Sequence, residues 1–502
     1  MGEVITSVSA SQRISAPEVW TAVFIFFVPA GVLFLSIMMM NHGVMIYTLD
    51  DPYIHMKMAR NIWAGHYGVN AGEYSAPSSS IIWPVLLAPF SMLGDAFYYA
   101  PLVLNIIFSL LTFLLMFDLL KRLNRQFSVL IAMGLFFSLN LYGLVFNGME
   151  HSLQVYLTVL IAAGVIRKEF FGEQKVSIVL YLAIFLLPLV RYEDLAISFP
   201  ALGYLFMSGE RWRVVYCGVA ILMALAAFSL FLQSVGLDVL PSSVLSKSDI
   251  SDLQSLAAHA LAQFKLWGWV VFGVLMLCCI YSRRMALVLL LLNVTVLHMV
   301  FGKSGWYGRY EVYWLAFVSL FFLVACSRYL SGRWMLVVFS CLPVAFTSFV
   351  YVTLSTPWAS ANIYNQQYMM ALIASRLNEP LAVNDLGLVS LVTDQYVLDL
   401  TGLANYEVLK FGRLESNSLW IGDLMRRHDV KYAFIYDEWF SKRPAYFIKV
   451  ASLKLVVPNI TSAEDSVSLY AVDSVSAVKL RGVLRAFREE EHSNKFEINY
   501  FE

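Results

Sequence analysis

Long apolar runs separated by short charged turns fill the first 354 residues and constrain the fold more than any other feature. A helix that crosses a bilayer needs about 20 mostly apolar residues, and fewer where neighbouring helices shelter its ends. We therefore expect a polytopic α-helical membrane protein with about 11–12 transmembrane helices. The candidate runs are residues 19–40, 79–94, 98–120, 127–146, 152–166, 177–190, 195–207, 214–234, 265–282, 285–301, 311–327 and 334–354.

The distribution of charge divides the chain into two predicted domains. Residues 1–354 carry 20 Lys and Arg with 17 Asp and Glu, whereas residues 355–502 carry 15 and 18 in less than half the length. The second part is about as charged as an average soluble domain. We therefore predict a membrane domain over 1–354 and a soluble domain over 355–502, which is long enough for its own core. The net charge of zero gives no indication of a nucleic-acid partner.

The soluble domain has the pattern of an α/β fold. Short apolar segments bounded by Asp, Asn and Gly are typical of strands, and one charged segment has helical spacing. We expect strands at 381–387, 396–403, 431–437, 453–459 and 466–473, and a helix at 421–430.

Basic residues concentrate in one set of turns, which indicates the cytoplasmic side of the membrane and places the N-terminus there. The run at 79–94 is short and contains two prolines. We expect that it, or one of the short runs around 191–194, does not span, so that the count is odd and the soluble domain lies outside. The protein is then a multi-pass protein of the bacterial inner membrane with an uncleaved first helix. The basic turns are 121–125, 167–175, 211–213, Arg283 with Arg284, and Arg328 with Arg333.

The first exterior loop, residues 41–78, carries an acidic pair, Asp50 and Asp51. Apolar residues recur at helical spacing over 54–62, which is typical of an amphipathic helix in the membrane interface. Asp51 directly precedes Pro52 and is expected to cap this helix. Asp50 has no such structural role. It is either a general base held at the membrane surface or a solvated loop acid.

Several short motifs follow the acidic pair in order along most of the chain. They are Y-I-H-x-K-x-A-R-N at 53–61, a glycine and a histidine before Asn70, G-x-E at 148–150, R-x-E at 191–193, L-P-x-S-x-x-S-K at 240–247, G-R-Y at 308–310, N-D-L-G at 384–387 and V-L-D-L-T-G-L at 397–403. This ordered set resembles the GT-C superfamily of membrane glycosyltransferases, and most closely the branch of the mycobacterial terminal arabinofuranosyltransferase. The chain departs from that branch in its short second span and at 191–194, where the family usually has proline after the arginine.

The resemblance implies an inverting hexosyl- or pentosyltransferase that moves a single sugar from a polyprenyl-phosphate carrier on the exterior face. The acceptor hydroxyl needs a base, and the leaving phosphate needs cations. Asp50 is the implied base, and Asp51 orients it or shares its proton. The implied ligands of the donor phosphate are Arg309, Lys247, Lys303 and Arg191, and the implied substrate-binding residues are His55, Arg60, His66, Glu150, Glu193 and Tyr310.

Most of these residues also have a structural interpretation. Exterior cations near span ends snorkel toward lipid headgroups, which applies to Lys303 more than to Arg309. Arg191 and Glu193 lie between short apolar runs and could simply pair with each other. Glu150 precedes a predicted helix, where an acid is favoured by the helix dipole.

The implied partners are a polyprenyl-phosphate-linked sugar donor, a glycan, lipid or protein acceptor, and membrane lipids. One acidic pair offers a hard cation too few oxygen ligands, so we expect no metal and no cofactor. A multi-helix transporter, a flippase of lipid-linked sugars and a ligase of lipid-linked glycans are the alternatives. A transporter usually has internal repeats and buried ionisable residues, a flippase does not need Asp50, and a ligase favours a larger late exterior loop.

Overall fold

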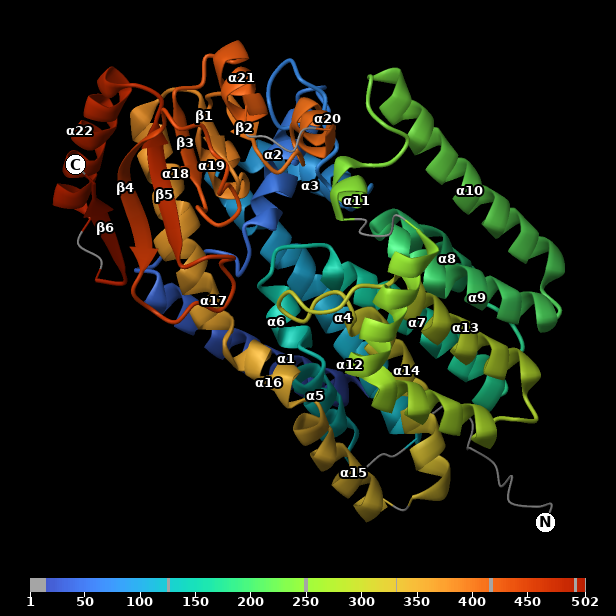
Figure 1. Ribbon diagram of the computed structural model, residues 1–502. Coiled ribbons are helices and arrows are strands. Elements are labelled where there is room, and N and C mark those ends of the chain that lie inside the picture. The colour runs from blue at the N-terminus through green and yellow to red at the C-terminus, as the bar shows by residue number, and fades with distance from the viewer. Residues whose placement is uncertain are drawn as a thin grey trace.

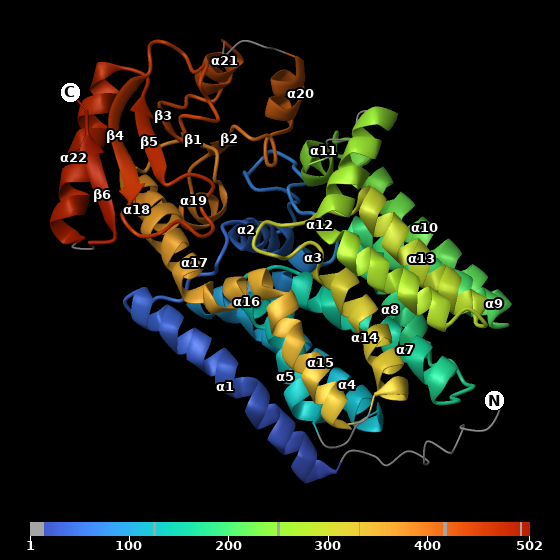
Figure 2. The same ribbon diagram turned by 60° about the horizontal axis from the view of Figure 1, so that its bottom comes forward.

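The computed structural model of the protein describes residues 15–123, 127–247, 252–330, 332–414, 419–491 and 494–501. It consists of a helical part and a sheet domain, which lies at one end of the helices in both views (Figures 1 and 2). Helices α2 (Asp51–Trp63) and α3 (Trp83–Leu87) lie between the two parts. They belong to the segment that follows the first long helix, so this segment is placed to contact both parts.

Apolar helices make up the helical part, as the hydropathy pattern predicts. Four stretches are long and apolar enough to cross a membrane: α1 (Ala16–Met40), Trp83–Leu123, α10 (Arg211–Ser234) and α12 (Leu253–Ile280). Shorter apolar helices are α5 (Ser128–Ser138), α8 (Ile178–Val190), α13 (Met285–Phe301) and α14 (Val312–Tyr329). The remaining helices are α6 (Leu141–Val145), α7 (His151–Phe170), η2 (Tyr192–Asp194), α9 (Leu195–Met207), α11 (Ser242–Lys247), α15 (Gly332–Ala345) and α16 (Thr347–Leu354).

The proline-containing run at 79–94 does not form a regular helix of its own. It contains the single turn α3 and most of the 3₁₀ segment η1 (Ala88–Tyr99), which leads into α4 (Ala100–Leu123). Pro84 and Pro89 lack the amide hydrogen that an α-helix interior needs, and Gly94 has a φ of 56°, which breaks the helical path.

Helix α2 confirms the helix predicted after the acidic pair, but its surroundings differ from the prediction. It packs against α3, η1 and helix α19 (Gly387–Val392) of the sheet domain. Ile54 and Met58 on its apolar side are buried by protein. The helix begins at Asp51, so Asp50 occupies the N-cap position, without a side-chain cap bond. The prediction that Asp51 caps α2 is therefore wrong.

The sheet domain contains one six-stranded sheet in the order β2-β1-β3-β5-β4-β6. Strands β2, β1 and β3 are parallel, and β5, β4 and β6 continue the sheet antiparallel. Four of the five predicted strand segments are confirmed by β1, β2, β3 and β5. The segment predicted at 453–459 overlaps β4 only at 453–455, and β6 is additional. The bounds are β1 (Leu381–Val383), β2 (Val397–Asp399), β3 (Tyr432–Ile435), β4 (Ile448–Leu455), β5 (Ser466–Ala471) and β6 (Phe496–Tyr500).

Successive residues of a strand point to opposite faces of the sheet, so the strands contribute to two cores. Helices cover both faces. In β1, Leu381 and Val383 join the core shared with the helical part, and Ala382 joins a separate core. Helix α22 (Ser474–Glu490) packs on β4 and β5 and contacts α18 (Met369–Leu377). The opposite core contains residues of α20 (Tyr406–Leu414) and α21 (Leu419–Arg427), which confirms the helix expected at 421–430.

One continuous helical rod connects the two parts. It runs through α17 (Thr356–Ile363), the π-helical turn η3 (Tyr364–Tyr368) and α18. Asn362 bonds the backbone on both sides of a sheet-domain loop, at Pro458 O (2.9 Å) and Ile460 N (2.6 Å). Gln366 donates to Glu464 O at 2.9 Å. The rod is thus hydrogen-bonded to the sheet domain along its length.

The outer edge of the sheet at β2 is also bonded to the segment after α1. The side chain of Asn70 accepts from Val397 N at 3.0 Å and donates to Val397 O at 2.9 Å. The next outward amide of the strand, Asp399 N, donates to the side chain of Asn405 at 2.6 Å. Asn70, which belongs to the first predicted exterior loop, therefore completes the hydrogen bonds of an edge strand.

Candidate functional site

The acidic pair lies where the helical part meets the sheet domain, and its two carboxylates have different partners. Asp50 faces the sheet domain: its carboxylate accepts hydrogen bonds from Gly387 N (2.6 Å) and Leu388 N (2.9 Å) at the start of α19. Each carboxylate oxygen has two lone pairs, so each retains one for a further proton donor. Asp50 as a whole residue is partly exposed.

Gly387 allows this close approach because it has no side chain. A Cβ at this position would lie 2.1 Å from the backbone oxygen of Asp50 and 2.7 Å from its carboxylate. The N-D-L-G motif therefore has a physical explanation here: glycine is the residue that lets the backbone of α19 touch the acid.

Asp51 faces the helical part and pairs with Arg309. The guanidinium Nη2 lies 2.7 Å from Asp51 Oδ2 and 2.9 Å from the hydroxyl of Tyr310. Arg309 is only 2% exposed, and its Nε and Nη1 have no hydrogen-bond partner among the described residues. Buried polar groups are almost always hydrogen-bonded, so these two donors are suited to oxygens of a bound anion or of water.

A left-handed turn directs Arg309 into this position. Residues 305–308 all have positive φ, between 43° and 92°, and the two central ones are Trp and Tyr. Such a conformation is costly for bulky residues, and here it is fixed by neighbours. Tyr307 donates from its hydroxyl to Thr356 Oγ1 at 2.8 Å, and Asn140 donates to Tyr307 O at 3.0 Å.

Arg191 lies next to this pair but is fully engaged. It binds Glu193 through Nε (2.8 Å) and Nη2 (3.2 Å), and Glu150 through Nη1 (2.6 Å). Glu150 also lies 3.7 Å from the imidazole of His55. All three partners of this network are predicted site residues, and Arg191 has no nitrogen left over. Arg191 therefore connects Glu150, at the start of α7, with Glu193 in η2.

Tyr310 joins the two arginines. Its ring lies 4.9 Å from the guanidinium of Arg309 and 5.4 Å from that of Arg191. The structure thus links seven predicted site residues in one continuous network, which Asp50 adjoins only through its chain neighbour Asp51. The seven are Asp51, His55, Glu150, Arg191, Glu193, Arg309 and Tyr310.

Arg60 and His66 bond elsewhere. Arg60 donates to Leu391 O at 3.2 Å and lies over the rings of Phe97 and Tyr98, which attaches α2 to α19. His66 lies 2.9 Å from Asn70 O and closes its own loop. Lys303 is half-buried on the loop before Arg309, and the side chain of Lys247 lies outside the described residues.

Asp385, which the sequence reasoning did not include, is the third carboxylate of the site. It stands two residues before Gly387 and accepts from Tyr436 Oη at 2.6 Å and Gln367 Nε2 at 2.9 Å. The π-helical turn provides Gln367, and such turns often occur at functional sites. Asp385 lies two residues after β1 at the carboxyl edge of the parallel strands, where ligands of α/β domains usually bind. This position after a predicted strand is the sequence feature from which Asp385 could have been identified as a site residue.

The crowding of carboxylates changes their acidity. Burial, together with the charges of Asp385 and Asp51, raises the pKa of Asp50 above its usual value, although the two amide bonds act in the opposite direction. Burial also raises the pKa of Asp385. A base with a raised pKa holds a proton more readily near neutral pH, which is the property that general-base catalysis requires.

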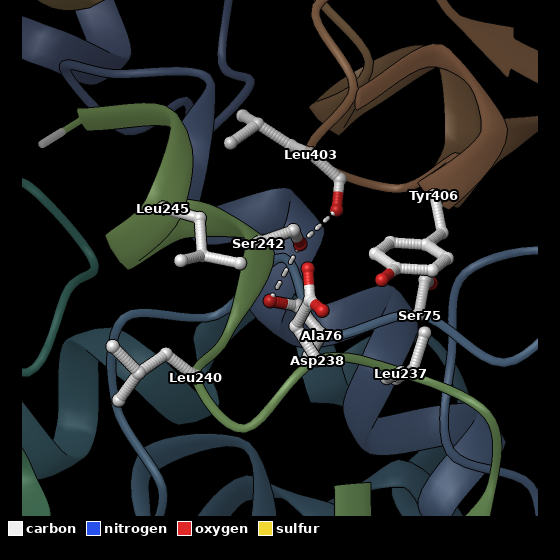
Figure 3. Close-up of a pocket in the computed structure, with 9 residues that line it drawn as sticks. All are labelled: Ser75, Ala76, Leu237, Asp238, Leu240, Ser242, Leu245, Leu403 and Tyr406. Carbon is white, nitrogen blue, oxygen red and sulfur yellow. Dashed lines mark hydrogen bonds between the residues drawn. The ribbon is translucent and has the colours of Figure 1, made fainter. Parts of the chain in front are cut away.

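The pocket in Figure 3 is separate from this network. It is lined by residues of α11 and the loop before it, of the loop after α2, and of α20 and the turn before it, and Ser242 Oγ lies within hydrogen-bond distance of Ala76 O and Leu403 O. None of the predicted site residues lines it. Among the described residues, no group of three His, Cys, Asp or Glu side chains is arranged to hold a metal ion.

Comparisons with known proteins give a domain match and several structural likenesses, two of which are described here and have low identity. The model of a domain of unknown function (DUF8728) matches residues 361–470, which include Asp385 and Gly387. The apo crystal structure of the Archaeoglobus fulgidus oligosaccharyltransferase is 11% identical with a TM-score of 0.48, over 95% of this chain and 79% of the other. Its complex with Zn and sulfate is 12% identical with a TM-score of 0.45, over 93% and 77%. No curated protein matches the chain.

Proposed function

We propose that the protein is a membrane-bound, inverting glycosyltransferase of the GT-C type that moves a single sugar from a polyprenyl-phosphate carrier to a hydroxyl of an extracytoplasmic acceptor. The proposal rests mainly on the different partners of the two acidic residues, Asp50 and Asp51. Asp50 is a partly exposed acid with lone pairs to spare, and Asp51 holds a buried arginine with two unpartnered donors. The ordered motifs of the sequence support the same reaction.

In this reaction the acceptor hydroxyl gives its proton to Asp50 while its oxygen attacks the anomeric carbon of the sugar. The bond from that carbon to the phosphate oxygen breaks, and polyprenyl phosphate leaves with the electron pair. Asp50 then carries the proton away from the new glycosidic bond. The attack and departure occur on opposite faces of the carbon, so the anomeric configuration inverts.

Arg309 is the best candidate to stabilise the leaving phosphate. Its unpartnered Nε and Nη1 point in different directions from the guanidinium, and each can donate to a phosphate oxygen. Arg191 is less suited, because Glu150 and Glu193 already occupy its nitrogens. We keep Lys247 and Lys303 as secondary phosphate ligands, and we place the site on the exterior side, with the N-terminus in the cytoplasm and the sheet domain outside the inner membrane.

The proposal is tested by giving the purified protein a set of synthetic polyprenyl-phosphate sugars with a membrane extract as acceptor source. The expected result is release of polyprenyl phosphate and a new glycoside of inverted configuration, measured by mass spectrometry and NMR. Transport of the intact lipid-linked sugar across proteoliposomes without release of polyprenyl phosphate would favour a flippase instead. Transfer of a preassembled oligosaccharide would favour a ligase.

A further inference from the structure

The two carboxylates of the acidic pair divide the site into a donor side and an acceptor side. Asp51 contacts Arg309 in the helical part, and Asp50 contacts the amides of α19 in the sheet domain. If the phosphate is held by Arg309, an in-line displacement requires the acceptor to approach from the opposite direction. That direction is the sheet domain, on the side of Asp385.

An aromatic path leads from this side of the site to the surface. Asp385 accepts a hydrogen bond of 2.6 Å from the hydroxyl of Tyr436, which is fully buried. The Tyr436 ring contacts the indole of Trp439 edge-on, with centroids 5.4 Å apart and an angle of 69°. Trp439 is 49% exposed. It therefore offers a rigid apolar surface that is two side-chain contacts from Asp385.

Two carboxyl groups lie in the same part of the sheet domain, one of them on the residue that precedes Trp439. Glu438 is exposed beside Trp439, and its carboxyl group lies against that of Glu464, whose pKa is raised by burial and by this neighbour. Glu464 is bonded to the rod through its backbone oxygen, which fixes the group relative to Tyr436 and Gln366. Carboxylates next to an exposed indole suit a sugar, because the C–H face of the ring packs on the indole and its hydroxyls donate to the oxygens.

We propose that the acceptor is a neutral glycan, and that the sugar adjacent to the reactive hydroxyl packs on Trp439 of the sheet domain. The inference rests on the proposed transfer reaction. The carboxylates of Asp50 and Asp385 disfavour an anionic group at the reacting hydroxyl, since like charges repel. An aromatic platform without a deep cavity is selective for sugars as a class rather than for one hydroxyl pattern.

The test compares two tryptophans of equal exposure. Trp439 and Trp358 are both 49% exposed, and Trp358 lies on α17. The full-length protein and its Trp439→Ala, Trp439→Phe and Trp358→Ala variants are applied to an array of neutral bacterial cell-envelope oligosaccharides and to an array of unmodified peptides. We expect the parent and Trp358→Ala to bind the same glycans. Trp439→Ala should bind them about tenfold more weakly, and Trp439→Phe should bind with an intermediate affinity.

Equal binding by Trp439→Ala and the parent would overturn the inference, as would binding of peptides in place of glycans or the absence of glycan binding by the parent. Size-exclusion profiles identify a variant that fails to fold, and Trp439→Phe then supplies the comparison. Release of polyprenyl phosphate is measured separately. Glycan binding through Trp439 without any release would refute the transfer reaction but not the glycan site. Transfer with an unchanged acceptor KM in Trp439→Ala would refute the glycan site alone.

Discussion

At the scale of single residues, acidic and basic side chains that look alike in the sequence have different partners in the structure. Asp50 and Asp51 are adjacent, yet one is bonded by backbone amides and the other by a buried guanidinium. Arg191 and Arg309 are both buried, yet only Arg309 has donors without a partner among the described residues. These differences assign a distinct role to each residue, and the roles lead to separate predictions.

Asp50→Asn should reduce transfer by about 10²–10⁴-fold, which is typical of the loss of a general base. Asn has nearly the same volume and its oxygen can still accept one bond from α19, so expression and carrier binding should be retained. Asp51→Asn should act mainly on the KM for the carrier, because its partner is Arg309. Single-turnover rates and carrier titrations of both variants separate these effects. Equal and complete loss of turnover in both would refute the division of roles.

Arg309→Ala should weaken both carrier binding and turnover, because developing charge on the phosphate loses its fixed cation. Arg309→Lys should keep part of the activity, since lysine supplies a point charge but not the fixed, planar set of donors of the guanidinium. The matched control is Arg376→Ala, which removes a partly exposed arginine at the far end of the rod. If Arg309→Ala binds and transfers like the parent, the phosphate site lies elsewhere.

The pH dependence of transfer tests the coupling between the carboxylates. Asp50 must be deprotonated to act as a base, so activity should rise with pH through its raised pKa and be lost below it. Asp385→Asn removes a neighbouring negative charge and should therefore move this acidic limb to lower pH. The measurement is the profile of kcat/KM against pH for both proteins. An unchanged acidic limb would mean that Asp385 does not act on Asp50.

At the scale of secondary structure, the short helix α19 is the element that completes the site. Gly387→Ala should lower kcat with little change in carrier KM, because a Cβ would lie 2.1 Å from the Asp50 backbone and force α19 away. Gly482→Ala on α22 is the control: nothing lies within 4 Å of its Cβ position, so the substitution should stabilise the helix by about 0.5–1 kcal/mol. Kinetics and thermal unfolding of both variants provide the measurement.

Local patterns predicted the elements better than their packing. Hydropathy located the apolar helices, and strand-like segments bounded by Asp and Gly located β1, β2, β3 and β5. The burial of α2 under α19 was not predictable, because an amphipathic helix has the same sequence pattern against lipid or protein. The roles of Asp385 and Tyr436 depend on a contact between residues 51 positions apart. Single-residue motifs carry no information about such a contact.

At the scale of the whole molecule, the position of the sheet domain relative to the membrane decides whether the proposed chemistry is exterior. Val478 on α22 is 67% exposed and Trp212 in a basic turn is 74% exposed. In a background without the five native cysteines, Val478→Cys should react with an impermeant maleimide in intact spheroplasts, and Trp212→Cys should react only after lysis. Labelling of Val478→Cys only after lysis would refute the topology.

The edge strand β2 has a consequence for work with fragments of this protein. Its outward amide and carbonyl groups are satisfied by Asn70, which belongs to the helical part. A recombinant fragment that begins at residue 355 would contain the whole sheet but would expose this strand edge. Exposed edges recruit strands from other molecules, so such a fragment should self-associate even if its own core forms. Adding the loop that carries Asn70 in trans is then the direct way to keep it monomeric.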